Sequence, residues 1–215
     1  MRVGGTSVIE AAGNLCSRDR LLASESPFES SKILRDLARA HDPNQVWRAT
    51  CESHLEGRTI VELRIDIGKV APGVHEAMFG LSKYLHKSGL DESLVNLICL
   101  RASQINGCAY SLDMHWKDLK AGGEQDQRLY GLDAWEESPY YSDRERAALA
   151  WTEAVTNIRD GHVPDEVYEQ VRTVFSPKEL ADLTLAVATI NAWNRLNIAA
   201  RTVPGAYQPA QKRGA

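Results

Sequence analysis

Several features that would assign a function at once are missing from this sequence. No apolar run is long enough to cross a membrane, and the first residues lack the apolar segment of a secretory signal. The formal net charge is −4, which argues against non-specific binding of nucleic acid. We therefore expect a cytoplasmic protein that binds neither membranes nor nucleic acids.

Patterns that hold metals or phosphates are also missing. The six histidines are isolated, and neither His-x-x-x-His nor Cys-x-x-Cys spacing occurs. The pair Gly122-Gly123 follows a predicted helix instead of opening one, so it does not resemble a phosphate-binding loop. The sequence predicts no metal site and no cofactor.

Cysteine is sparse, and alternating strand patterns are lacking. The four cysteines are too few for a disulfide scaffold, and in a reducing compartment we expect free thiols. No convincing period-two run, internal repeat or low-complexity tract occurs. Apolar residues instead recur at helical spacing from Val74 to Ala200, which predicts an all-α helical bundle.

Capping residues indicate where these helices begin. Pro72 can open one helix and Asp91 can cap the next. Ser142 with Glu145, and Ser176 with Glu179, match the capping-box pattern. Apolar positions at helical spacing form the predicted buried face of the helix that Pro72 opens: Val74, Met78, Leu81 and Leu85. The polar segment 124–141 has three predicted anchors: Leu129, Leu132 and Trp135.

The chain divides into two parts by composition. Residues 1–63 are predicted to be an N-terminal extension, partly disordered, with a possible short helix from Phe28 to His41. Residues 64–215 carry the regular helical pattern and are predicted to form the main domain.

The stretch Asn96–His115 carries the candidate chemistry. After Asn106-Gly107 interrupts one helical run, Cys108, Ser111 and His115 recur on one face of the next. Cys108 lies at the start of that helix, where unpaired amide groups and the helix dipole favour a thiolate. A buried structural cysteine and a core histidine are the alternatives to a reactive pair.

This stretch resembles the core motif of the carboxymuconolactone decarboxylase family, which includes the AhpD-like alkylhydroperoxidases. The family pattern is a glutamate followed by Ser-x-x-Asn-x-Cys-x-x-Cys-x-x-x-His. Ser103, Asn106, Cys108 and His115 match it, and the resemblance extends over residues 64–205. Ser111 replaces the second cysteine, and Asn96 replaces the glutamate.

The resemblance implies thiol-dependent reduction of hydroperoxides, a peroxiredoxin-type antioxidant activity. In the family the second cysteine attacks the peroxide, the first resolves, and the histidine relays protons with the glutamate. Cys108, His115, Ser111 and Asn96 are therefore the predicted catalytic residues, although a hydroxyl forms neither sulfenic acid nor disulfide. The activity is expected to be impaired.

Other interpretations stay open. Glu92 could lend a carboxylate and Cys99 a second thiol, although first-turn capping and core packing are the simpler explanations. The family also includes lactone decarboxylases, which work by proton transfer, so a lyase acting on a lactone is one alternative. A non-catalytic structural or binding homologue is another. The resemblance further implies a homo-oligomer, trimer or hexamer, and a possible thiol reductant protein as partner.

Overall fold

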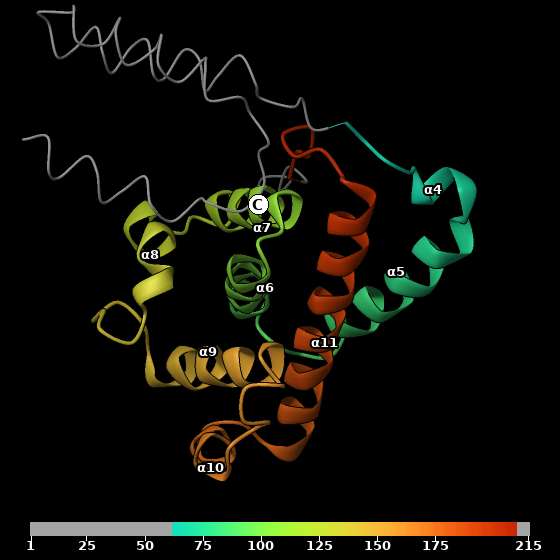
Figure 1. Cartoon of the computed structure of the whole chain (residues 1–215). Helices are drawn as coiled ribbons and strands as arrows, with labels where there is room; N and C mark the ends of the chain where they lie inside the picture. The colour runs from blue at the N-terminus through green and yellow to red at the C-terminus, as the bar shows by residue number, and fades with distance from the viewer. Residues whose placement is uncertain (1–61, 210–215) are drawn as a thin grey trace, which may run out of the picture. The chain divides into compact units, whose positions relative to one another are not determined.

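The computed structural model describes residues 62–209, and these residues form only helices and connecting segments (Figure 1). The expected all-α class is therefore confirmed for this part of the chain. The expected extension, residues 1–63, lies almost entirely outside the described residues. Within the described part, no helix is both long enough and apolar enough to span a membrane.

The elements follow one another with short connections. In chain order they are α4 (Ile67–Val70), α5 (Pro72–His86), α6 (Glu92–Asn106), α7 (Ala109–Ala121), α8 (Asp126–Tyr130), the 3-10 helix η1 (Leu132–Ala134), α9 (Asp143–Thr156), α10 (Asp165–Arg172) and α11 (Pro177–Ala200).

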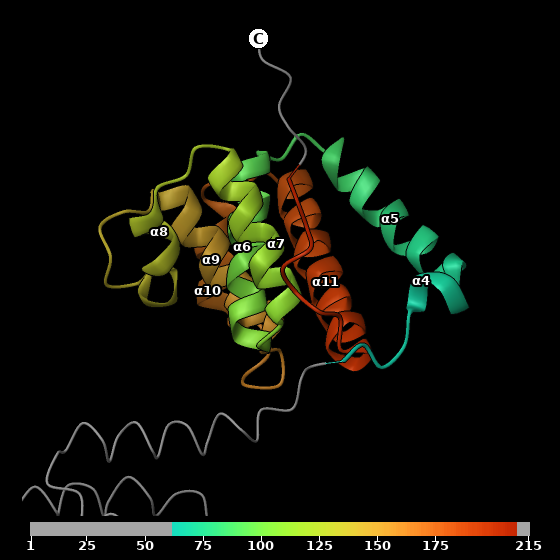
Figure 2. The ribbon, with the colours of Figure 1, turned by 90° about the horizontal axis from the view of Figure 1, so that it is seen from above.

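Helix α6 is the centre of the bundle, because it packs against α7, α9 and α11. One of its faces, with Leu94 and Ile98, joins a core cluster shared with α9, α10 and α11. The opposite face, with Leu97 and Leu100, joins a second cluster that α7, α8 and η1 complete. In Figure 2, α11 lies between α5 on one side and α6 and α7 on the other.

The predicted helix starts are confirmed by their caps. The Asp91 carboxylate accepts a hydrogen bond from Leu94 N at 2.9 Å. Both capping boxes form, with Ser142 and Glu145 at α9 and Ser176 and Glu179 at α11. Each box pairs two amide groups that the helix itself leaves without partners.

The predicted buried face of α5 is wrong in part. Leu85 is buried, but Val74 and Leu81 are each 37% exposed. Helix α5 packs mainly against α11 and the short α4, so among residues 62–209 most of its apolar face has no covering helix. Sequence periodicity gives the apolar face of a helix but not how many other helices cover it.

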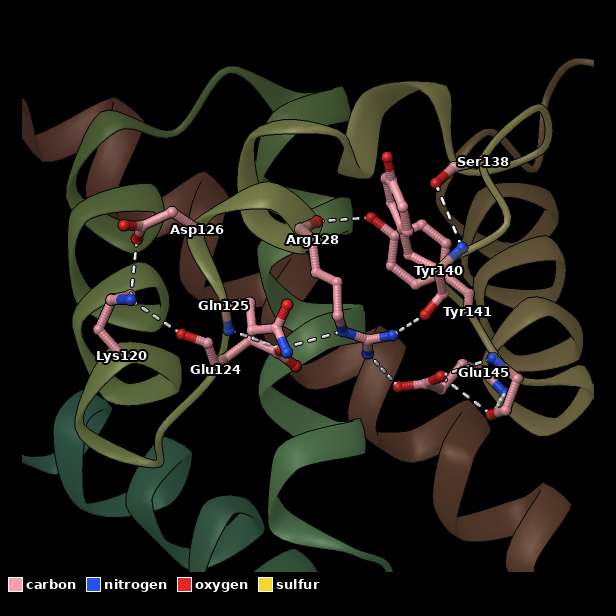
Figure 3. Close-up of polar contacts among 10 residues, drawn as sticks. Lys120, Glu124, Gln125, Asp126, Arg128, Ser138, Tyr140, Tyr141 and Glu145 are labelled. Carbon is pink, nitrogen blue, oxygen red and sulfur yellow. Dashed lines mark hydrogen bonds and ion pairs between the residues drawn. The ribbon is translucent and has the colours of Figure 1, made fainter.

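The segment between α7 and α9 is fixed by one arginine (Figure 3). Arg128 forms ion pairs with Glu124 at 2.9 Å and Glu145 at 2.5 Å, and donates to the Tyr140 carbonyl. The Tyr141 hydroxyl donates back to the Arg128 carbonyl at 2.5 Å. These contacts fix the polar segment beside the bundle, where its predicted anchors are all buried: Leu129, Leu132 and Trp135.

Candidate active site

The turn between α6 and α7 places the cysteine of the motif. Gly107 ends α6 with a φ of 68°, a left-handed conformation that glycine adopts without steric cost. The Cys108 amide then donates to the Ser103 carbonyl at 3.0 Å. Cys108 is consequently the N-cap of α7, one position before the first helical residue. The predicted start of this helix is confirmed.

Cys108 and Ser111 face each other within the first turn of α7. The thiol donates a hydrogen bond to the serine oxygen, with 3.2 Å between Sγ and Oγ. Each residue is only 1% exposed. The predicted shared face is therefore present, but the thiol is enclosed and hydrogen-bonded, so a solvent-borne reagent does not meet it directly.

His115 lies further along α7 and contacts α6. Its Nδ1 is 3.0 Å from Asn96 Oδ1, so an Nδ1–H tautomer donates to the amide oxygen. Its Nε2 is buried and has no hydrogen-bond partner among the described residues. Burial lowers the pKa of His115 to about 4, so the ring is neutral near pH 7. The structure thus brings Asn96 and His115 together as an oriented, uncharged pair.

The serine and asparagine of the motif contact α11. Asn106 Nδ2 donates to Asn191 Oδ1 at 3.0 Å and to Asn194 Oδ1 at 2.9 Å. Asn194 Nδ2 donates to Ser103 Oγ at 3.1 Å, and that hydroxyl donates to the Cys99 carbonyl at 2.7 Å. Ser103 and Asn106 therefore fix the end of α6, and with it the turn that holds Cys108.

Removing the centre of this network should destabilise the fold. Asn194→Ala breaks two buried hydrogen bonds, one from Asn106 Nδ2 and one to Ser103 Oγ, which costs about 2 kcal/mol. Urea unfolding measures this difference, with Asn157→Ala at the exposed end of α9 as the matched control. A loss no larger than in the control would contradict the role given to Asn194.

The two substitute residues considered from the sequence lie elsewhere. Cys99 belongs to the core cluster of α6, α9 and α11, where burial raises the pKa of its thiol to about 12. No described residue of the site is within hydrogen-bonding distance of the Cys99 thiol or the Glu92 carboxylate. Glu92 is exposed in the first turn of α6. The geometry therefore agrees with the structural interpretation of both.

The buried Ser111 is part of the lining of a cavity of about 350 Å³. Residues from α4, α5, α7 and α11 line it, including His75 and Phe79 of α5, Tyr110, Ser111 and Met114 of α7, and Trp193 of α11. Neither Cys108 nor His115 borders it. The contribution of α5 was not predicted from the sequence, although His75 and Phe79 are four residues apart and form an aromatic pair.

No group of three or more metal-ligating side chains occurs among residues 62–209. The site instead combines a thiol, a hydroxyl and an oriented imidazole beside an apolar cavity. The structure is thus an all-α bundle with a buried thiol site at the turn between α6 and α7. The model of the carboxymuconolactone decarboxylase family matches residues 72–154, and the chain belongs to this family, with an AhpD-like fold.

Similar proteins agree with this assignment. YdfG of Bacillus subtilis (strain 168) is 40% identical over 136 residues, which are 63% of this chain and 92% of YdfG. A solved structure from Agrobacterium tumefaciens, proposed to be the antioxidant defence protein AhpD, is 38% identical to this chain with a TM-score of 0.66. The alignment covers 68% of this chain and 100% of that one.

A more distant structure shows the same fold. A peroxidase-related protein of Ralstonia eutropha JMP134, with an alkylhydroperoxidase AhpD core, is 18% identical with a TM-score of 0.58. The alignment covers 79% of this chain and 89% of that one.

Proposed function

We propose that this protein is a slow, thiol-dependent hydroperoxide reductase of the AhpD-like type, with Cys108 as its redox thiol. The observation that carries the proposal is the contact between Cys108 Sγ and Ser111 Oγ, where Ser111 lines the apolar cavity and Asn96 orients His115 on the same helix pair. Residues 64–215 would form the catalytic domain, and residues 1–63 an extension to it.

The proposed reaction uses one cysteine. The Cys108 thiolate attacks the terminal oxygen of the hydroperoxide, and the S–O bond forms as the O–O bond breaks. The alkoxide takes up the proton that the thiol lost and leaves as the alcohol. Cys108 becomes a sulfenic acid. A dithiol such as dithiothreitol then reduces it to the thiol, releasing water and forming the oxidised dithiol.

Three features of the site make this reaction slow. The residue that meets the cavity is Ser111, whose hydroxyl is a weak nucleophile and cannot be oxidised to a sulfenic acid. Cys108 lies behind it and is 1% exposed. His115, with a pKa of about 4, is too weak a base at neutral pH to hold the proton of the thiol.

The test is consumption of cumene hydroperoxide with dithiothreitol as reductant, comparing the parent with Cys108→Ser. We expect a low rate that the substitution abolishes, whereas Cys99→Ser should retain it because Cys99 belongs to the core cluster. Equal rates for the parent and Cys108→Ser would refute the proposal. A folded protein without peroxidase activity that decarboxylates a lactone would instead indicate the lyase, and one without either activity a binding homologue.

A further inference from the structure

The cavity beside Ser111 has an aromatic wall. The rings of His75, Phe79 and Trp193 lie with centroids 5.4 to 5.9 Å apart and planes tilted by 55° to 75°. These separations are typical of aromatic groups that pack edge to face. Phe79 is 60% exposed, so this wall reaches the protein surface and can receive another ring from solvent.

No cationic Lys or Arg side chain is among the described residues that line the cavity. Its single carboxylate, Asp66, accepts from the Lys69 amide and forms an ion pair with the Lys69 ammonium group at 3.0 Å. An anionic ligand would find no Lys or Arg counter-ion among these lining residues, and the Asp66 carboxylate is already paired with Lys69. The cavity therefore suits an uncharged molecule.

The Ser111 side chain offers a hydrogen-bond donor in the cavity lining. Ser111 Oγ accepts the thiol hydrogen of Cys108, which leaves the serine hydroxyl hydrogen for a ligand oxygen. The volume of about 350 Å³ is at the small end of the 300–1,000 Å³ range of small-molecule sites. The lining thus favours a small, uncharged ligand that carries an oxygen able to accept a hydrogen bond.

We propose that this cavity binds an uncharged aryl compound that carries a hydrogen-bond-accepting oxygen, with its ring against His75, Phe79 and Trp193 and its oxygen at Ser111. The inference deepens the proposed function and rests on it for the reacting group: the substrate is then an arylalkyl hydroperoxide, in preference to hydrogen peroxide or a charged hydroperoxide.

The test is binding of 2-phenyl-2-propanol, an uncharged aryl alcohol, to the parent protein. Nuclear magnetic resonance of the indole N–H groups follows the titration, and Trp193→Phe assigns the signal of Trp193. We expect saturable movement of that signal. Two comparison ligands, 2-methyl-2-propanol without the ring and phenylacetate with a charge, should each bind at least tenfold more weakly.

Two variants tie the binding to the cavity. Ser82→Leu fills part of the cavity from α5, and its hydroxyl bonds only within its own helix, to the Met78 carbonyl, so its loss leaves no partner stranded. Binding should weaken at least tenfold. Phe79→Ala removes a ring that is 60% exposed, and binding should weaken at least threefold. The control is Tyr130→Ala, an exposed aromatic of α8 outside the cavity.

The inference is overturned if the Trp193 signal does not move, if phenylacetate binds as tightly as the alcohol, or if both cavity variants bind like the control. Binding of the alcohol requires no thiol chemistry. If the parent protein does not bind the alcohol but still reduces hydroperoxide, only this inference is overturned. If the parent binds the alcohol but does not reduce hydroperoxide, only the proposed reaction is overturned.

Discussion

The variant with both Ser111→Cys and Asn96→Glu is expected to consume organic hydroperoxide at least about a hundredfold faster than the parent. Ser111→Cys places a thiol in the cavity lining, so the attacking sulfur meets the substrate directly. The present separation of 3.2 Å between Sγ and Oγ leaves only a small rotation to an S–S bond of about 2.05 Å. Cys108 can then resolve the sulfenic acid formed on the new thiol at position 111 as a disulfide, releasing water.

The glutamate restores the strength of the base. A carboxylate at position 96, beside Nδ1 of His115, stabilises the imidazolium form and raises the pKa of the histidine from about 4 towards neutrality. His115 can then take the proton of the new thiol. Both substitutions act on one proton transfer, so Asn96→Glu alone should change the rate very little.

Hydroperoxide consumption by the parent, the two single variants and the double variant measures this dependence. Ser111→Ala with Asn96→Glu is the matched control, because it carries the glutamate without a second thiol. A parent rate equal to that of the double variant, abolished by Cys99→Ser, would show that Cys99 supplies the missing thiol. Ser111 would then not be the reason for a slow reaction.

Stability should fall between pH 6.5 and pH 4 because of His115. The unfolded histidine binds a proton below its ordinary pKa of 6.5, whereas the buried ring binds one only below about 4. The unfolded state therefore binds more protons in this range, and the free energy of unfolding increases with pH across it. The contribution of the neutral His115 ring to the free energy of unfolding is on the order of 3 kcal/mol. This contribution is fully present above pH 6.5 and lost at pH 4.

Urea unfolding from pH 4.5 to 7.5 measures this effect, with His115→Gln as the test variant. Glutamine does not titrate, so most of the slope between pH 4.5 and 6.5 should disappear. His86→Gln, at an exposed histidine of α5, should keep the slope of the parent. The pKa of Glu179, lowered to about 2 by its bonds to Ser176 and Arg144, affects stability only below about pH 4.5, outside the fitted range. An unchanged slope in His115→Gln would show that the ring is not buried in its neutral form.

The features predicted correctly from the sequence are those that depend on neighbours in the chain. Asp91, Ser142 and Ser176 bond to amides three residues away, and Gly107 sets its own backbone angle, so local patterns determine these helix ends. The helical period likewise places Cys108 and Ser111 on one face of α7.

The remaining features depend on contacts between distant segments. The cavity wall of His75 and Trp193 and the contact of Asn106 with α11 each join residues that no local period relates. Burial of the Cys108 thiol, which the sequence left open as an alternative to a reactive thiol, depends on distant segments for the same reason, because α7 alone would leave its first turn accessible. The exposed half of α5 shows the converse case, an apolar pattern that no helix in the described part of the chain covers.

Two adjacent residues of α11 face different parts of the molecule. Trp193 forms part of the cavity wall, and Asn194 bonds to Ser103, whose carbonyl accepts the Cys108 amide. A shift of this one helical turn displaces the cavity wall and the backbone that carries the thiol in the same movement. If the proposed function holds, substitutions on this turn of α11 that change ligand binding will also change the reactivity of the thiol.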